Sequence, residues 1–132
     1  MNDTTPPTDA QQVFSVAPWA VDFFNQCLDF LSGSKRNVWI YGDGFKVYLR
    51  KSRRLQGHCL DIASVDVEAE TQGKKRFTGI LMTVEGLAIG SGFDGVFVEN
   101  VLSERFADFF RKNDWREIGA ETGVSSFFKV TK

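Results

Sequence analysis

The chain has 132 residues, with 16 lysine and arginine residues against 17 aspartate and glutamate residues and a formal net charge of −1. A domain usually takes roughly 100–200 residues, so the length predicts one domain. The balanced charge excludes an overall attraction to nucleic acid or to an anionic membrane, and any basic function must therefore be local. Hydrophobic residues make up 42% of the chain and aromatic residues 14%, which is typical of an ordered globular protein.

No segment approaches the roughly 20 consecutive apolar residues that a membrane span requires, and the acidic, Pro- and Thr-rich N-terminus is unlike a secretory signal. A soluble, cytoplasmic protein is therefore expected. Cys27, Cys59 and the single histidine, His58, lack metal-ligand spacing, so neither a metal site nor a disulfide is expected. His58 and Cys59 are neighbours on a predicted strand and point to opposite faces, which argues against a Cys–His nucleophile.

The first half of the chain predicts a tail, a helix and three strands. Residues 1–12 lack apolar periodicity, so we interpret them as a flexible tail before an ordered domain at residues 13–132. From Pro18 to Gly33, apolar residues recur at helical spacing and predict an amphipathic helix. The runs 37–41 and 45–51 flank Asp43-Gly44, which predicts a β-hairpin. The basic segment 50–57 is expected to form a loop, and the β-branched and apolar run 58–68 a central strand.

The second half alternates helices and strands. Apolar residues return at helical spacing from Phe77 to Leu87, and Gly90-Ser91-Gly92 ends that helix. Residues 95–99 predict a short strand, Ser103 is expected to cap a third helix, and residues 115–131 predict two strands joined near Glu121–Gly123. The order predicts an α/β fold with a mixed sheet flanked by about three helices, in which each strand–helix–strand step places two parallel strands side by side.

A short polar loop joins the central strand to the second helix within residues 62–81. A helix N-terminus leaves amide groups without intrahelical partners and carries roughly half a positive charge. Lys74, Lys75 and Arg76 lie beside this one in the sequence. The segment is therefore a candidate pyrophosphate site, and a solvated, basic helix start is the alternative interpretation.

In this order and spacing, the chain resembles the GNAT superfamily of acetyl-CoA-dependent N-acetyltransferases. In that family the fourth strand leads through a Q/R-x-x-G-x-G/A loop into the third helix, and the matching loop here is Gln72-Gly73-Lys74-Lys75-Arg76-Phe77. The segment VFVENVLSERFADFFRKNDW is similar to the fifth strand, the helix after it and the aromatic residue that opens the sixth strand, and SFFKV to the last strand. The resemblance covers residues 13–131. The chain departs from the loop pattern at Lys75, where the family has glycine, and at Phe77, where it has glycine or alanine.

The resemblance implies an acetyl-CoA site in the splay between the fourth and fifth strands of the family. The backbone near Val65 and Val67 would pair with the pantetheine arm as an added strand would. Asn100 would hydrogen-bond that arm, or serve only as a turn or cap residue. The pyrophosphate would lie against Gln72, Gly73, Lys74, Lys75, Arg76, Phe77 and Thr78.

Acetyl transfer to an amine requires a base for the ammonium proton and an acid for the leaving thiolate. The resemblance to a histone-modifying branch favours Asp61 as the base, with Glu68 and Glu99 as further candidates. An ion pair between Asp61 and an arginine of the 50–54 run is the alternative. The tyrosine that often supplies the acid is replaced by Phe110, which has no proton to give.

Two functions are compatible with these residues. The first is an enzyme that transfers an acetyl group from acetyl-CoA to a primary amine of a small molecule or protein. The second is a catalytically inactive protein of the same fold that binds a partner protein, which Lys75, Phe77 and Phe110 favour. The basic run Arg50, Lys51, Arg53 and Arg54 is of the type that contacts single-stranded nucleic acid, but charged residues also protect strand edges, and nucleic acid is not expected as a partner.

Overall fold

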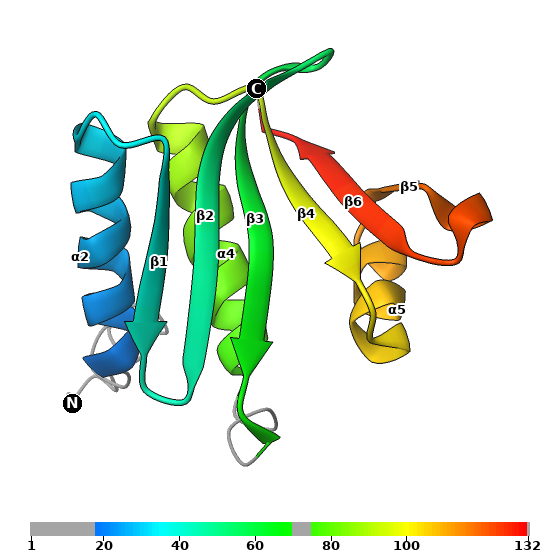
Figure 1. Cartoon of the computed structure of the whole chain (residues 1–132), viewed down its shortest axis with the longest axis horizontal. Coiled ribbons are helices and arrows are strands. Elements are labelled where there is room, and N and C mark those ends of the chain that lie inside the picture. The colour runs from blue at the N-terminus through cyan, green and yellow to red at the C-terminus, as the bar shows by residue number, and fades with distance from the viewer. Residues whose placement is uncertain (1–17, 70–74, 132) are drawn as a thin grey trace, which may run out of the picture.

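The computed structural model describes residues 18–69 and 75–131 (Figure 1). The predicted tail at residues 1–12, the expected domain start at residue 13 and the loop residues Gln72, Gly73 and Lys74 lie outside the described residues. The elements are α2 Pro18–Ser32, β1 Asn37–Gly42, β2 Phe45–Arg54, β3 Gly57–Val67, α4 Arg76–Gly90, β4 Gly95–Val101, α5 Glu104–Lys112, β5 Arg116–Ile118, the 3₁₀ turn η1 Ala120–Thr122 and β6 Ser125–Val130.

The six strands form one mixed sheet in the order β1-β2-β3-β4-β6-β5. β3 and β4 are parallel, with α4 as the crossover, and the other neighbouring pairs are antiparallel. The α/β fold with a mixed sheet is therefore confirmed. None of the helices in the two described ranges is long and apolar enough to cross a membrane.

The expectation of a second parallel neighbour pair, across α5, is wrong. β6 lies between β4 and β5 and is antiparallel to both. The burial of the two strands gives the reason. β6 carries Phe127 and Phe128, which are buried on opposite faces of the sheet, whereas none of the three residues of β5 is buried. The strand with more apolar surface takes the interior position, and the short polar strand stays at the edge.

The helices of the described residues pack on one face of the sheet, and Figure 1 shows α4 and α5 behind the strands. In α2, Phe23, Cys27 and Phe30 recur at i, i+4 and i+7 and are all buried, whereas Phe24 and Leu28 are exposed. One core cluster joins residues of α2, α4 and α5 to the sheet: Phe23, Ile80, Val84 and Phe110 with Val47, Ile62, Val98 and Phe127. The opposite face has only a small apolar cluster of Cys59, Phe97 and Phe128, so most of it is free of helices in the described part.

Several local predictions are confirmed by the backbone. Asp43 and Gly44 form the β1–β2 turn, and Gly44 has the positive φ of 78° that favours glycine. The Oγ of Ser103 accepts a hydrogen bond from the amide of Phe106 at 3.4 Å and so caps α5.

The expected loop at residues 50–57 is wrong, because this segment continues the β2–β3 hairpin. β2 runs to Arg54, which pairs with Gly57, and Leu55 and Gln56 form the turn. The segment has no apolar alternation, so its strand character could not be predicted locally. The stabilising partner is Asp61 on β3, which forms ion pairs with Arg50 and Arg54 across the strands.

Candidate functional site

The parallel strands β3 and β4 separate halfway along their length. They pair from Cys59 with Gly95 to Ile62 with Val98, and the register ends there. Beyond this point β3 stays with β2 and β4 stays with β6, and Figure 1 shows the two strands diverging. The edge of β3 at residues 63–67 therefore faces a gap in which no described strand pairs with it.

Bulges in both strands accompany the separation. On β3, Tyr48 pairs with Ser64 and Leu49 with Ile62, so Ala63 is an extra residue. β4 pairs with β6 at Val98–Phe127 and again at Val101–Ser125. Between these two pairs β4 has two residues, Glu99 and Asn100, whereas β6 has only Ser126, so β4 contains one extra residue. An extra residue bends its strand and increases the local twist, which accounts for the divergence.

Asn100 lies in the bulge of β4 and has an unusual, positive backbone φ angle. Its φ is 53°, in the left-handed region that asparagine tolerates better than most residues, and its amide donates to Ser126 Oγ at 3.0 Å. Asn100 is thus a bulge residue within β4 at the mouth of the gap, and the alternative role of a turn or cap residue is wrong.

A cavity of about 430 Å³ occupies the gap between β3, β4 and the starts of α4 and α5. It brings together four of the predicted site residues: Val65, Phe77, Glu99 and Asn100. The other lining residues are Ala63, Ser64, Val101, Leu102, Ser103 and Phe106. Val67 is not among them, because its side chain is 7% exposed and belongs to the core cluster.

The N-terminus of α4 opens beside this cavity. Its first intrahelical hydrogen bond runs from the amide of Gly79 to the carbonyl of Lys75 at 3.0 Å, so the amides of Arg76, Phe77 and Thr78 have no acceptor within the helix. Lys75 precedes the helix with φ 62° and ψ 27°. The lysine thus has the left-handed backbone that glycine would take more easily at this place.

The side chains at the start of α4 are turned away from the helix terminus. Arg76 is tied to the β1–β2 turn, because its guanidinium donates to the Asp43 carbonyl at 3.1 Å and lies 4.7 Å from the ring centroid of Trp19. Phe77 stacks on Phe106 with centroids 4.0 Å apart. A ligand at this terminus would therefore meet backbone amides and the exposed Lys75 rather than the Arg76 side chain.

Asp61 lies on the helix-free face, is fully buried and is surrounded by donors. It accepts hydrogen bonds from Arg50 Nε at 3.0 Å, from Ser52 Oγ at 2.8 Å and from Arg54 Nη2 at 2.9 Å. Asp61 therefore forms ion pairs with arginines of the 50–54 run, which was the alternative interpretation of this residue.

Glu99 connects this network to the cavity. Arg50 donates to its carboxylate, and Arg54 Nη2 donates to it at 3.1 Å. Burial lowers the pKa of Arg50 and Arg54, but hydrogen bonds and attraction from Asp61 and Glu99 outweigh it, so both guanidinium groups have raised pKa values. Glu99 therefore combines a cavity wall position with a fixed cationic support.

The remaining catalytic candidates lie elsewhere. Glu68 is exposed at the end of β3, where its amide donates to the Gly44 carbonyl at 2.8 Å. Phe110, at the position where the resemblance expects an acid, is fully buried and stacks on Phe127 with centroids 4.7 Å apart. In the described residues, no group of three or more histidine, cysteine, aspartate or glutamate side chains is arranged to hold a metal ion.

A row of aromatic and hydroxyl residues leads to the cavity on the helix-free face, and sequence reasoning missed it. Trp39 pairs with Tyr48, and Tyr48 with Ser64, which lines the cavity. Trp39 is 44% exposed and its ring lies 4.8 Å from that of Tyr48. The alternation of buried Ile40 with exposed Trp39 and Tyr41 along β1 is the sequence signal that could have located this row.

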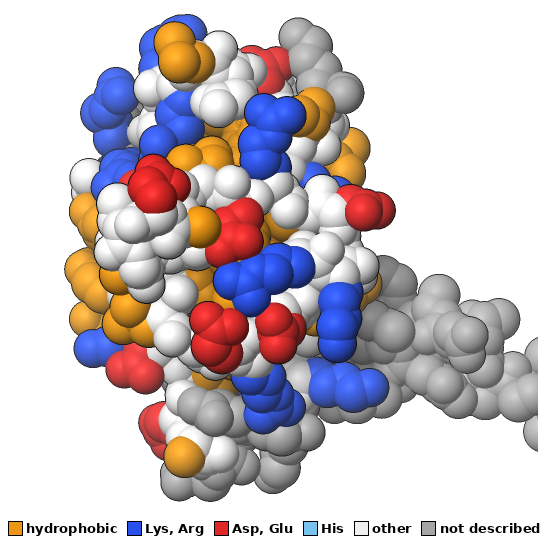
Figure 2. Space-filling view, turned by 90° about the vertical axis from the view of Figure 1, so that its right-hand side faces the viewer, with side chains coloured by type: hydrophobic (Ala, Val, Ile, Leu, Met, Phe, Trp, Pro, Cys, Tyr) orange, Lys and Arg blue, Asp and Glu red, His pale blue; other side chains and the backbone are white. Residues whose placement is uncertain are grey.

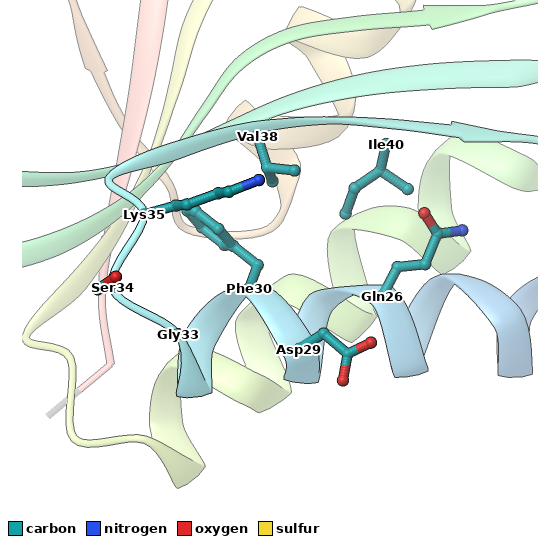
Figure 3. A pocket seen from close by; sticks show the side chains of 8 residues that line it. All are labelled: Gln26, Asp29, Phe30, Gly33, Ser34, Lys35, Val38 and Ile40. Carbon is teal, nitrogen blue, oxygen red and sulfur yellow. The ribbon is translucent and has the colours of Figure 1, made fainter.

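A second cavity, of about 400 Å³, lies between α2 and β1 (Figure 3). Phe30 from α2 and Val38 and Ile40 from β1 form its apolar wall, and Asp29 and Lys35 are polar groups at its border. It shares no lining residue with the cavity between β3 and β4. On another side of the molecule, Figure 2 shows charges of both signs interspersed, in keeping with Arg111, which pairs with Glu104, Asp108 and Glu117.

No protein-family model and no curated protein matches the sequence. Solved structures do match the fold. A protein assigned to the acyl-CoA N-acyltransferases of Klebsiella pneumoniae is 13% identical, with 96% of this chain and 93% of that chain covered and a TM-score of 0.58. A GNAT-family acetyltransferase of Streptococcus pneumoniae is also 13% identical, with coverage of 81% and 74% and a TM-score of 0.56.

The AtaTR structure with bound AcCoA is 16% identical, covers 66% of this chain and has a TM-score of 0.51. This chain spans 57% of that protein and 60% of a GNAT-family acetyltransferase of Staphylococcus aureus Mu50. At these identities the likeness shows the fold. The protein has the fold of the GNAT acetyltransferases, as the sequence resemblance implied.

Proposed function

We propose that this protein is an acyltransferase that binds acetyl-CoA between β3 and β4 and transfers its acetyl group to a primary amine. The observation that carries the proposal is the cavity at the point where β3 and β4 separate, next to the N-terminus of α4. The fold is similar to that of a GNAT-family acetyltransferase of Streptococcus pneumoniae and to that of AtaTR, which was solved with AcCoA bound, and this similarity supports the proposal. The acceptor amine belongs to a small molecule or a protein.

The cavity fits an extended amide chain such as the pantetheine arm. The β3 edge at residues 63–67 offers strand-like amide and carbonyl groups on the side where β4 has left, and such an edge binds an extended chain as an added strand. Val65 is half-buried in the cavity wall, and Val67 remains a predicted member of this site. Asn100 on the opposite wall can donate to and accept from an amide.

The start of α4 fits the diphosphate. The amides of Arg76, Phe77 and Thr78 precede the first intrahelical hydrogen bond, and an anion at a helix N-terminus is stabilised by these donors and by the helix dipole. Lys75 adds an exposed cation. Gln72, Gly73 and Lys74 remain predicted members of this site.

We assign the base to Glu99 rather than to Asp61 or Glu68, because Glu99 lines the cavity and the other two do not. Bound acetyl-CoA supplies the activated acetyl group. Glu99 takes the proton of the acceptor ammonium, directly or through water, while the amine nitrogen bonds to the acetyl carbon and the carbon–sulfur bond breaks. The second proton of the amine nitrogen passes through water to the leaving thiolate, because Phe110 has none to give. Arg50 and Arg54 hold the Glu99 carboxylate, and Asp61 holds the arginines.

The acceptor approaches over the helix-free face in this proposal. The row Trp39–Tyr48–Ser64 ends at the cavity, and aromatic faces attract cations such as an ammonium group. Lys46 already shows this preference, because its ammonium lies 5.6 Å from the ring centroid of Trp39.

Calorimetric titration with acetyl-CoA tests the proposal. The wild-type protein should bind, and Asn100→Gly, which keeps the positive φ but removes the side chain, should bind about fivefold more weakly through loss of a hydrogen bond worth about 1 kcal/mol. Asp114→Gly is the matched control: Asp114 also has a positive φ, of 65°, and does not line the cavity. No heat with millimolar acetyl-CoA would refute the proposal.

The partner-binding alternative is favoured by the burial of Phe110 where an acid is usual. Thiol release from acetyl-CoA in the presence of simple amines separates the two functions. An enzyme releases thiol, and Glu99→Gln slows this at least tenfold while leaving the Kd of acetyl-CoA unchanged. Binding without thiol release for any amine would leave the fold as a scaffold for a partner protein.

A further inference from the structure

The basic run Arg50–Arg54 is divided by the sheet into two sets of different chemistry. Successive side chains of β2 point to opposite faces. Arg50 and Arg54 lie on the helix-free face and are paired with Asp61 and Glu99. Lys51 and Arg53 lie on the other face, where the helices pack. The second set has no role in the acyltransferase site.

The strands are longer than the helix that covers them at this end. α2 ends at Ser32, whereas β2 runs to Arg54. The segment after α2 leads into β1, and its last residue continues the β1–β2 pairing, because the amide of Lys51 donates to the Arg36 carbonyl at 2.8 Å. Lysine and arginine side chains from the segment and from the strand therefore meet.

These lysine and arginine side chains enclose a cavity of about 200 Å³, and each residue that lines it is either cationic or neutral. Lys35 and Arg36 come from the segment, Lys51 and Arg53 from β2, and His58 from β3, together with two serines. None of the residues that line this cavity is acidic. In a chain with a net charge of −1, four lysine and arginine residues around one small cavity create a strongly positive local potential.

Three of these cations have no carboxylate partner within residues 18–69 and 75–131. No described aspartate or glutamate pairs with the side chains of Lys35, Arg36 or Arg53, in contrast to Arg50, Arg54, Arg76 and Arg111. Lys51 serves the helix end, because its Nζ donates to the Gly33 carbonyl at 3.0 Å. Asp94, which does not line the cavity, accepts a hydrogen bond from the amide of His58 at 2.9 Å.

We propose that this cavity binds a phosphate group. Two guanidinium groups can each donate two parallel hydrogen bonds to phosphate oxygens, and Lys35 adds a mobile cation. The site is separate from the acetyl-CoA cavity. His58 and Ser64 are six residues apart on β3, which corresponds to roughly 20 Å at about 3.3 Å per strand residue. The phosphate belongs either to a free ion or to a phosphate monoester.

Titration followed by amide NMR tests the assignment, with inorganic phosphate and phenyl phosphate as separate probes and potassium chloride at matched ionic strength as the reference. Saturable shifts at residues 34–36 and 51–53 with either probe, absent with chloride, are expected. Tighter binding of phenyl phosphate identifies a monoester as the source, and tighter binding of inorganic phosphate identifies the free ion. Shifts that merely follow ionic strength overturn the proposal.

Variants locate the site. Arg53→Gln should weaken phosphate binding at least tenfold, because a charge-assisted bidentate contact is lost. Arg105→Gln, which removes an exposed arginine of α5, should leave the affinity unchanged, as should Asn100→Gly in the other cavity. Equal losses in Arg53→Gln and Arg105→Gln would overturn the site. Arg53 is exposed, so folding of the variant is expected and is checked in the same amide spectra.

Discussion

The guanidinium of Arg54 lies 3.7 Å from the ring centroid of Phe97 while its Nη2 donates to the fully buried carboxylate of Asp61 at 2.9 Å. The aromatic ring covers one face of the cation and the carboxylate takes its edge. This arrangement fixes the position of Arg54, which in turn holds Glu99 at the wall of the cavity between β3 and β4.

Removing Asp61 should therefore destabilise the fold and disturb Glu99. Asp61→Ala leaves two guanidinium groups facing each other without their shared acceptor, and the free energy of unfolding should fall by about 3 kcal/mol. Urea denaturation measures it. Asp22→Ala, at an exposed position of α2, is the control and should change stability by less than about 0.5 kcal/mol. Equal stability of Asp61→Ala and wild type would contradict the assigned role.

Glu117 should give the protein an acid-dependent stability. Hydrogen bonds from Arg111 and from Ser125 lower the pKa of Glu117 from its ordinary 4.5 to about 2. Because the folded pKa is the lower one, the stabilisation is complete above pH 4.5 and is lost as the pH falls from there to about 2. Urea denaturation of wild type and Glu117→Gln at several pH values should show a stability difference that shrinks over this interval. A constant difference from pH 6 to pH 2 would count against the ion pair.

Two glycines of α4 should respond in opposite directions to alanine. At Gly86 a Cβ would meet nothing within 4 Å, so Gly86→Ala should stabilise the helix by about 1 kcal/mol. At Gly79 a Cβ would come within 2.7 Å of the Trp19 ring, so the same substitution should destabilise the protein by about 1 kcal/mol despite the gain in helix propensity. Thermal unfolding of both variants measures the pair, and a shift of the same sign in both would contradict the packing of Trp19 on α4.

Lys75 should carry backbone strain at the start of α4. Lys75→Gly and Lys75→Ala both remove the cation, but only glycine adopts a φ of 62° without steric cost. The glycine variant should therefore be more stable than the alanine variant by about 1 kcal/mol in urea denaturation. In the proposed function both variants should bind acetyl-CoA more weakly than wild type, and by the same factor. An alanine variant as stable as the glycine variant would show that the left-handed backbone is not retained.

The sequence by itself determined the elements whose signals are local. Helical spacing predicted α2 and the burial of Phe23 and Cys27, and Asp43-Gly44 fixed the first hairpin turn. Ser103 marked the start of α5. These predictions succeeded because a helix stripe, a tight turn and an N-cap depend on residues only a few positions apart.

The tertiary structure decided which residues form the sites. The run Arg50–Arg54 gave no local sign of being a strand, because its stability depends on Asp61 of β3 and Glu99 of β4, distant in sequence. The cavity depends on bulges at Ala63 and at Glu99–Asn100, which exist only relative to the register of β2 and β6. The interior place of β6 follows from competition between strands for apolar neighbours. Register and strand order arise from pairing across the sheet, and such long-range pairing leaves no periodic trace within the strand itself.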